Sequence, residues 1–279
     1  MPELPEVEVV RRGLELHVVG RRIERVEVGR ERTVRRTSAA AVVTGLTGAT
    51  MTAARRRGKY LVCDLDNGRA VMVHLRMSGQ LVLAPASSPR PSHAHVVLTL
   101  TGDQELRFVD PRTFGEVVVF DPGRADVEVP ELGRLGPDPV ADGLTMRQLR
   151  RLLAARSRQV KALLLDQHAL AGLGNIYTDE VLHVARVRYD RPANALTGRQ
   201  VGALHRAMEA VLADAIAAGG STLGDAQYVG LSGEAGRYQE QHRVYGRAGS
   251  PCPRCRGRNV IVRAPFGGRS TFFCARCQR

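Results

Sequence analysis

Residues 252–277 read CPRCRGRNVIVRAPFGGRSTFFCARC, and this stretch decides the fold of the C-terminal end of the chain. Two Cys-x-x-Cys pairs, Cys252 with Cys255 and Cys274 with Cys277, are separated by eighteen residues. This spacing is typical of a structural zinc ribbon, and a pair of redox dithiols is the alternative. Four thiolates close a tetrahedral shell and leave no open position for catalysis. The pattern therefore predicts one structural Zn²⁺ and a short hairpin between the cysteine pairs.

The region before the ribbon has a helical period. Residues 144–156 predict one helix, residues 160–187 predict two more, and residues 198–220 predict a fourth. The break at 172–175, GLGN, can present backbone N–H groups to a phosphate as helix N-termini do, although an ordinary turn between helices gives the same pattern. From residue 220 to about 245 no clear period remains, and glycines are frequent, so we expect a mobile loop there.

The N-terminal part combines one helix with many short strands. Residues 4–19 keep a helical period that Gly20 ends. From about 21 to 120 the apolar residues alternate in short β-branched segments, which predicts a β-sandwich or barrel with a hairpin loop at 101–103. Cys63 lies in one of these strands and is expected in the core. The chain is therefore expected to be an α+β multidomain protein, with an N-terminal helix and β-sandwich (1–120), a linker (121–143), a helical domain (144–240) and a zinc ribbon (241–279).

The balance of charged residues indicates which class of partner the protein binds. The 279 residues include 41 Lys+Arg and 28 Asp+Glu, which gives a formal net charge of +13. This excess favours a polyanion, with nucleic acid first, although a generally basic proteome would give the same sum. At 43% hydrophobic residues the chain can bury a core. No apolar run is long enough to span a membrane, and no signal peptide is visible, so we expect a soluble cytosolic protein.

Only two lysines, Lys59 and Lys161, remain among the basic residues, and the others are all arginine. Arginine replaces lysine where charge alone suffices, but not where a compact ammonium that can lose its proton is needed. Both lysines are therefore candidate functional positions, with chance survival as the alternative.

The N-terminus offers a nucleophile and two carboxylates. Removal of Met1 would expose the secondary amine of Pro2, and α-amino groups have a pKa of about 8. Such an amine can attack a sugar C1′ and give a cationic iminium, an electron sink for elimination. Glu3 and Glu6 fall on one face of the first helical turn, where one could act as a general acid. Ordinary methionine processing and complementation of the helix dipole are the alternatives.

Several segments resemble formamidopyrimidine-DNA glycosylase, the bacterial repair enzyme for oxidised purines. The similarity runs in family order from residue 2 to 278. The similar segments are MPELPEVEVVRRGL at 1–14, RRGKYL at 56–61, HLRMSGQL at 74–81, DPRTFG at 110–115, VKALLLDQ at 160–167, GLGNIYTDE at 172–180 and GRSTFFCARCQ at 268–278.

The resemblance implies a role for each matching residue. Pro2 would be the Schiff-base nucleophile, Glu3 the proton donor in base excision, and Lys59 the general acid–base of β-elimination. Arg269 would hold the phosphate and assist δ-elimination, and Glu6 would support the site. The positions that would contact DNA are His74, His93, Arg112, Arg156, Lys161 and Asn175. Those that would fill the hole left by an extruded base are Met77, Arg112 and Phe114.

The resemblance also implies a helix–two-turn–helix domain, damaged double-stranded DNA as partner, a monomer, and a bacterial cytoplasmic protein associated with the nucleoid. Two features depart from the family. Arg76 stands where the family usually has glycine, and residues 221–240 match the lesion-capping loop only loosely. Two alternatives stay open: an endonuclease-eight-type enzyme for oxidised pyrimidines, and a non-catalytic zinc-ribbon DNA-binding protein.

Overall fold

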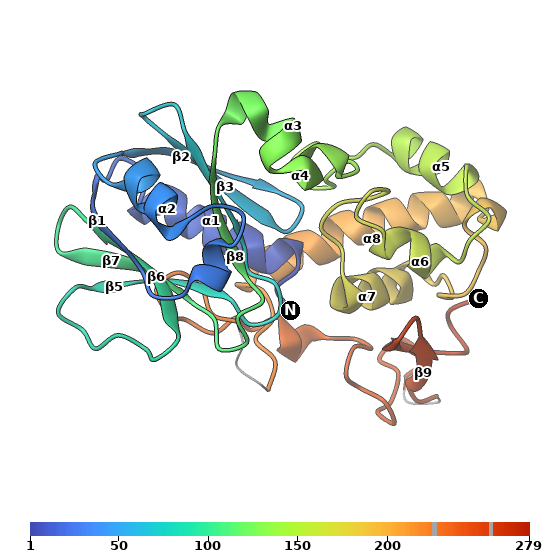
Figure 1. Ribbon diagram of the computed structural model, residues 1–279. Helices are drawn as coiled ribbons and strands as arrows, with labels where there is room; N and C mark the ends of the chain where they lie inside the picture. Colours follow the sequence, from blue (N-terminus) through green and yellow to red (C-terminus); the bar gives the residue numbers. More distant parts are fainter. Residues whose placement is uncertain (225–227, 257–258) are drawn as a thin grey trace. The chain divides into compact units, whose positions relative to one another are not determined.

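A computed structural model describes residues 1–224, 228–256 and 259–279, and the chain forms two compact units (Figure 1). The first unit comprises Met1–Arg134 and Ala218–Arg237, and the second comprises Leu135–Ala217 and Tyr238–Arg279. Residues 225–227 of the expected lesion-capping loop and residues 257–258 of the expected ribbon lie outside the described part of the chain.

The first unit is built around two four-stranded antiparallel sheets, with strand orders β1-β6-β7-β5 and β2-β3-β4-β8. Their facing side chains form one apolar core, in which Val71 and Val96 come from opposite sheets. This is the expected sandwich, and Cys63 is buried in it, where burial raises the pKa of its thiol to about 12. The strands are β1 (Ile23–Val28), β2 (Met51–Arg57), β3 (Tyr60–Leu65), β4 (Ala70–His74), β5 (Gln80–Pro85), β6 (Ala94–Leu100), β7 (Gln104–Val109) and β8 (Glu116–Phe120).

Helix α1 (Leu4–His17) leads into this sandwich and buries Val7, Val10 and Leu14 in its core. Pro5 suits the first turn because those backbone N–H groups have no helical acceptor. The chain leaves the helix through Gly20, whose φ of +85° is a conformation that glycine adopts without a steric cost. The helix thus begins and ends close to the expected residues 4 and 19.

Short helices occur where the sequence predicted only strands or a linker. Ser38 caps α2 (Ala39–Leu46) by accepting a hydrogen bond from Ala41 N at 3.1 Å, and the helix buries Val42 and Leu46, four residues apart. A 3-10 turn, η1 (Glu31–Val34), precedes α2. The segment 121–143 begins with three short helices, which are η2 (Pro122–Arg124), α3 (Ala125–Glu128) and α4 (Pro130–Arg134). Local caps and prolines produce these turns, and such short turns have too few residues to show a period.

The second unit contains the four expected helices and the expected hairpin. A capping box of Thr145 and Gln148 begins the first of them. A left-handed residue, Arg186, ends the third. The elements are α5 (Met146–Ala154), α6 (Val160–Leu165), α7 (Asn175–Ala185), η3 (Ala193–Ala195), α8 (Gly198–Ala217), η4 (Tyr238–Gln241), β9 (Val262–Phe266) and β10 (Arg269–Phe273).

The segment 218–237 packs with the first unit, although it was expected in the helical domain (144–240). Leu83 N on β5 donates a hydrogen bond to Leu231 O at 2.7 Å, and Tyr228 and Leu231 are part of the sandwich core. The side chain of Leu231 lies so close to Gly13 that a Cβ there would meet it at 2.8 Å. Apolar burial therefore assigns this segment to the sandwich.

A buried ion pair links α6, α7 and the ribbon hairpin. Lys161 Nζ donates to Asp179 Oδ1 at 2.7 Å, and both side chains are almost fully buried. Asp179 also accepts from Thr271 Oγ1 at 2.8 Å and from Phe272 N at 2.9 Å. The ammonium lies 5.3 Å from the Phe266 ring centroid. Asp179 thus ties β10 to the helices, and Lys161 balances its charge.

Replacing Lys161 by Met should destabilise the second unit by about 3–5 kcal/mol, because the Asp179 carboxylate would lose its buried counter-ion. Arg147→Met, on an exposed face of α5, is the matched control and should change stability by less than about 0.5 kcal/mol. Urea unfolding monitored by amide exchange in α7 and β10 measures both. A loss below about 1 kcal/mol for Lys161→Met would contradict this role for the ion pair.

Candidate functional site

The N-terminus and the first turn of α1 bring Pro2, Glu3 and Glu6 together in buried positions. Glu6 Oε2 accepts a hydrogen bond from Glu3 N at 2.8 Å, and Glu6 Oε1 accepts one from Ser221 N at 2.8 Å. The carboxylate of Glu6 therefore joins the N-terminus of the chain to the start of segment 218–237. Tyr228 strengthens this link, because its hydroxyl lies 3.1 Å from Gly219 O and 3.4 Å from Glu6 O.

Lys59 is almost buried in the turn between β2 and β3, directly after Gly58 with its φ of +57°. Arg56 holds this turn, since its guanidinium donates to Gly58 O at 2.9 Å and to Glu8 Oε2 on α1 at 3.0 Å. Burial opposes ionisation of Glu8, but hydrogen bonds from Arg11, Arg56 and Arg12 outweigh it and lower the pKa of this carboxyl. The charged pair thus fixes the lysine turn to the helix that carries Pro2.

His74 is a neutral imidazole at the end of β4. Its burial, together with the positive charges of Arg76 and Lys59, lowers its pKa to about 3. Arg76 N donates to His74 Nδ1 at 2.9 Å, so the ring proton is on Nε2. The Tyr60 ring contacts the imidazole edge-on, with centroids 4.3 Å apart. His74 can therefore donate one hydrogen bond from Nε2 at neutral pH.

Arg76, which departs from the family pattern, has a φ of +54°. This left-handed conformation explains why the family usually has glycine at the position, because an L side chain there costs free energy. The Arg76 guanidinium lies 3.3 Å from Glu116 Oε1, and Arg35 and Arg36 also pair with this buried carboxylate. The substitution thus keeps the turn and adds a cation beside Met77.

The three expected intercalating residues lie at the ends of two loops that Asp110 connects. Its Oδ1 accepts from Ser78 Oγ at 2.5 Å and from Arg112 N at 3.3 Å, and its Oδ2 accepts from Gly115 N at 2.7 Å. Met77 and Phe114 are exposed, and the Arg112 guanidinium lies 5.1 Å from the Phe114 ring centroid. Exposed apolar side chains on two rigid turns fit a wedge better than a core.

Two other expected DNA contacts, His93 and Arg156, are exposed on loops of different units. His93 precedes β6, and its carbonyl accepts from Asp110 N at 3.0 Å. Arg156 follows α5.

In the second unit, Asn175 and Arg269 share one end of the ribbon hairpin. Asn175 begins α7, and its Nδ2 donates to Ser270 O at 2.8 Å. The Asn175 Oδ1 atom is buried without a hydrogen-bond partner among the described residues. Arg269 is exposed directly after Gly267 and Gly268, whose positive φ values, +53° and +75°, make the tight turn of the hairpin. The N-terminus of α7 and the hairpin tip therefore lie side by side.

The structure contradicts the expected phosphate contact of Lys161. This side chain is fully buried and paired with Asp179, so it cannot reach a phosphate. Its survival in an arginine-rich chain has a packing reason, because the compact ammonium fits between Asp179 and the Phe266 ring where a planar guanidinium would need more space.

The four ribbon cysteines form a compact cluster, with all four Sγ atoms within 4.8 Å of one another. Cys252 Sγ lies 3.9 Å from Cys277 Sγ, and Cys255 Sγ lies 3.7 Å from Cys274 Sγ. Regular tetrahedral zinc with bonds of about 2.3 Å requires sulfur atoms about 3.8 Å apart. The cluster thus fits one Zn²⁺ with four thiolates. His183 Nε2 on α7 lies 3.5 Å from Cys252 Sγ and supports the cluster from the helical side.

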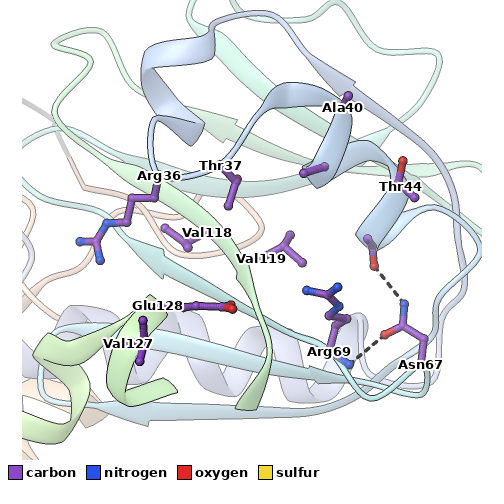
Figure 2. Close-up of a pocket in the computed structure, with 12 residues that line it drawn as sticks. Arg36, Thr37, Ala40, Thr44, Asn67, Arg69, Val118, Val119, Val127 and Glu128 are labelled. Carbon is purple, nitrogen blue, oxygen red and sulfur yellow. Dashed lines mark hydrogen bonds between the residues drawn. The ribbon is translucent and has the colours of Figure 1, made fainter. Parts of the chain in front are cut away.

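The first unit also contains a hollow of about 900 Å³, and Figure 2 shows residues that line it. It lies between α2, α3 and β8, and Asn67 closes one side by donating to Gly45 O and accepting from Arg69 N. None of the candidate catalytic, DNA-binding or metal residues lines it. Its size alone therefore does not make it the functional site.

Comparison with known proteins identifies the family. Residues 1–117 match the formamidopyrimidine-DNA glycosylase N-terminal domain, residues 135–227 match the H2TH domain of that enzyme, and residues 249–279 match the zinc finger found in FPG and IleRS. The chain belongs to the formamidopyrimidine-DNA glycosylase family.

Relatives and solved structures cover essentially the whole chain. The formamidopyrimidine-DNA glycosylase of Acidothermus cellulolyticus is 46% identical and that of Bacillus subtilis 42% identical, over 100% of this chain and 97% and 99% of theirs. The crystal structure of the MutM (Fpg) protein from Thermus thermophilus is similar with a TM-score of 0.88 at 40% identity, covering 99% of this chain and 98% of that one. A complex between Lactococcus lactis Fpg and DNA containing an abasic site is similar with a TM-score of 0.89 at 34% identity, covering 99% of both chains.

The family domains agree with the expected architecture of sandwich, H2TH helices and zinc finger. Among the helices that the structure describes, none has the length and apolar character to cross a membrane.

Four residues that hold the candidate site together were not predicted from the sequence. Glu8, Arg56, Asp110 and Ser78 are buried or nearly so, and each connects segments that are far apart in the chain. Glu8 has Arg11 and Arg12 three and four residues later, which is the pattern of an exposed helical ion pair. Asp110 and Ser78 lie inside motifs that match the family, so that match was the one signal that could have found them.

Glycine at position 76 should be more stable than alanine there by about 1 kcal/mol, since glycine relieves the left-handed strain and alanine does not. Both variants, Arg76→Gly and Arg76→Ala, lack the ion pair with Glu116, so the difference between their unfolding free energies does not include that pair. At Arg150, inside α5, the order should reverse, with alanine better by about 1 kcal/mol. Denaturant unfolding of the four variants checks both signs. Equal stability of Gly and Ala at position 76 would contradict a strained backbone.

Removal of zinc should disorder the ribbon and leave the sandwich folded, because the two units have separate cores. We expect one zinc per chain by elemental analysis. After chelation, amide exchange should rise in β9 and β10 and stay low in β3 and β4. A chelated protein with a protected β9–β10 hairpin would show that the thiolates alone hold it.

Proposed function

We propose that this protein is a bifunctional DNA glycosylase and abasic-site lyase that removes oxidised purines, 8-oxoguanine and formamidopyrimidines, from duplex DNA. The observation that carries the proposal is the anchoring of the first α1 turn, by Glu6 to Ser221 and by Glu8 through Arg56 to the Lys59 turn. A chain terminus is ordinarily free to move, and a nucleophile gains rate from being held in place.

Pro2 acts as the nucleophile once Met1 has been removed. Its secondary amine attacks C1′ of the damaged nucleotide, and the bond from C1′ to the base breaks. The departing base takes a proton from Glu3, which is buried beside Pro2. The amine nitrogen loses its proton, the C1′–O4′ bond breaks with a proton taken up by O4′, and the sugar ring opens. The product is an iminium between Pro2 and C1′, whose positive charge makes the C2′ protons acidic. Loss of a C2′ proton then expels the 3′ phosphate, and a second elimination expels the 5′ phosphate.

Lys59 moves protons during these eliminations. A lysine ammonium can lose and regain its proton during a reaction, whereas arginine stays charged. Lys59 is nearly buried, and its positive charge helps to keep His74 neutral. His74 in turn offers its Nε2–H to a phosphate oxygen.

Residues of the second unit bind the phosphates of the cleaved strand. Arg269 at the hairpin tip binds the phosphate and assists its expulsion in the second elimination. Asn175 and the backbone N–H groups at the start of α7 hold an adjacent phosphate, as helix N-termini do. His93 and Arg156 add exposed contacts. The zinc holds the ribbon that carries Arg269 and takes no part in the reaction.

Met77, Arg112 and Phe114 fill the space that the extruded nucleotide leaves. Apolar wedges unstack the neighbouring base pairs, and Arg112 donates hydrogen bonds to the orphaned base. Glycosylases of oxidised pyrimidines share this chemistry, so the lesion class rests on the family. We further propose that the protein acts as a monomer in the bacterial cytoplasm, associated with the nucleoid through DNA.

Borohydride reduction should link an 8-oxoguanine duplex covalently to the Pro2 nitrogen, because it reduces the iminium. A form that keeps Met1, and the variant Pro2→Gly, should both show sharply reduced trapping. Pro5→Ala, in the same turn, is the matched control and should trap normally. Peptide mapping of the adduct identifies the linked residue. Undiminished trapping by the form that keeps Met1 would exclude Pro2 as the nucleophile.

Lys59→Arg should lower single-turnover excision or nicking by at least about tenfold, because arginine cannot take part in proton transfer. Affinity for an uncleavable abasic analogue should stay nearly unchanged, since the charge is retained. Arg69→Lys, an exchange of the same two residue types at an exposed turn, should leave both rates and affinity unchanged. Parental rates in Lys59→Arg would exclude its acid–base role.

A further inference from the structure

A hollow of about 750 Å³ in the second unit is surrounded by arginines. Its described lining contains no Asp or Glu. The arginines are exposed, and none of them forms an ion pair with a carboxylate among the described residues. They come from the end of α7, the start of α8 and both cysteine knuckles, and they are Arg186, Arg199, Arg254, Arg256, Arg276 and Arg279. We name these six residues the arginine basin.

The arginine basin lies at the opposite ends of the two elements that carry the proposed DNA contacts. Asn175 begins α7, whereas Ala185 and Arg186 at its other end line the basin. Eleven helical residues at 1.5 Å each separate these ends by about 15 Å. Arg269 is at the tip of the β9–β10 hairpin, whereas Cys255 and Cys277 at its base line the basin. A phosphate at Asn175 and Arg269 therefore does not occupy the basin.

Local charges within the protein do not account for so many arginines. The C-terminal end of α7 carries about half a negative charge, which favours Arg186. A Zn²⁺ ion with four thiolates has a net charge of −2, which favours two further arginines nearby. The six positive charges of the guanidinium groups exceed the sum of these two negative charges. Like charges around one hollow repel one another unless an anion lies between them.

One further exposed arginine, Arg206, follows the arginine basin on α8. Arg199 and Arg206 are both exposed and seven residues apart, so they lie on the same face of this helix. Exposed arginines spread over both cysteine knuckles and the ends of two helices fit a linear polyanion better than a small enclosed anion. Duplex DNA carries one negative charge for about every 1.7 Å of its axis.

We propose that the arginine basin binds the phosphate backbone of a second DNA duplex while the first duplex occupies the lesion site. The choice of DNA over other polyanions rests on the proposed function. Binding at the basin depends on charge alone, because exposed arginines on phosphates do not read the sequence. A protein that holds two segments can pass directly from one to the other while it searches for damage.

The test uses the full-length zinc-loaded protein, saturated with a short duplex that contains an uncleavable abasic analogue. A second, undamaged and labelled duplex is then titrated at about 50 mM salt and at higher salt, with fluorescence anisotropy as readout. We expect a complex with two duplexes per protein. Its formation constant should fall with salt with a log–log slope of about −0.9 for each phosphate contact.

The charge reversals Arg199→Glu and Arg276→Glu together should weaken binding of the second duplex by at least about tenfold. Nicking of an abasic duplex should keep its parental rate. Arg25→Glu with Arg124→Glu, exposed residues of the first unit, makes the same change in charge and should leave second-duplex binding nearly unchanged. Arg199→Glu alone, on α8, gives the same direction of effect if Arg276→Glu lowers the zinc content.

Absence of a second-duplex complex at low salt, with nicking intact, would overturn the proposal while leaving the proposed function standing. Equal binding by the basin and control variants would also overturn it. The proposal fails as well if poly-glutamate binds the saturated protein through the basin and an undamaged duplex does not, because the surface would then suit an acidic protein. Loss of nicking in the parent protein would instead count against the proposed function.

Discussion

A carboxylate removed from water must be given hydrogen-bond donors, and this constraint shapes the functional loops of the protein. Glu6 takes its donors from Glu3 and Ser221, and so fixes both the N-terminus and segment 218–237. Asp110 takes them from the turn that carries Arg112. In the second unit, Glu180 accepts the backbone N–H groups of residues 243–245 and thereby holds the entry to the ribbon. Each carboxylate converts a loop into a rigid support.

Rigidity of this kind suits the proposed chemistry, because reacting groups gain rate from being held in place. The proposed nucleophile is a chain terminus, the proposed acid–base residue lies in a tight turn, and the proposed wedge residues lie on two turns. None of these places is held by a helix or a strand alone. Arg56 and Glu8 connect the Lys59 turn to α1, so the groups of the first unit share one frame. The turn at Arg76 keeps its shape although arginine replaces the glycine usual in the family. Arg76 has the positive φ that glycine favours, and its guanidinium pairs with Glu116.

Positive charge is distributed unevenly over the two units. In the first unit many arginines are paired, as Arg35, Arg36 and Arg76 are with Glu116, and these pairs organise structure. In the second unit the six arginines of the basin lack carboxylate partners within the described chain, and such charges are available to a ligand. The net charge of +13 therefore understates how strongly the helical and zinc-binding unit attracts polyanions.

The sequence by itself determined the period-two strands of the sandwich, the four helices of 144–220 and the cysteine spacing, because each is a local pattern of apolar residues or ligands. It also placed the candidate residues through their motifs. Only the tertiary structure decided that Lys161 is buried against Asp179 and that segment 218–237 packs on the sandwich. It also decided that Asp110, Glu8 and Arg56 connect the loops of the candidate site. These outcomes depend on which residues meet across long separations in the chain. These long-range contacts determine which side chains are buried and which charges are paired, and a local hydrophobic period carries no information about either.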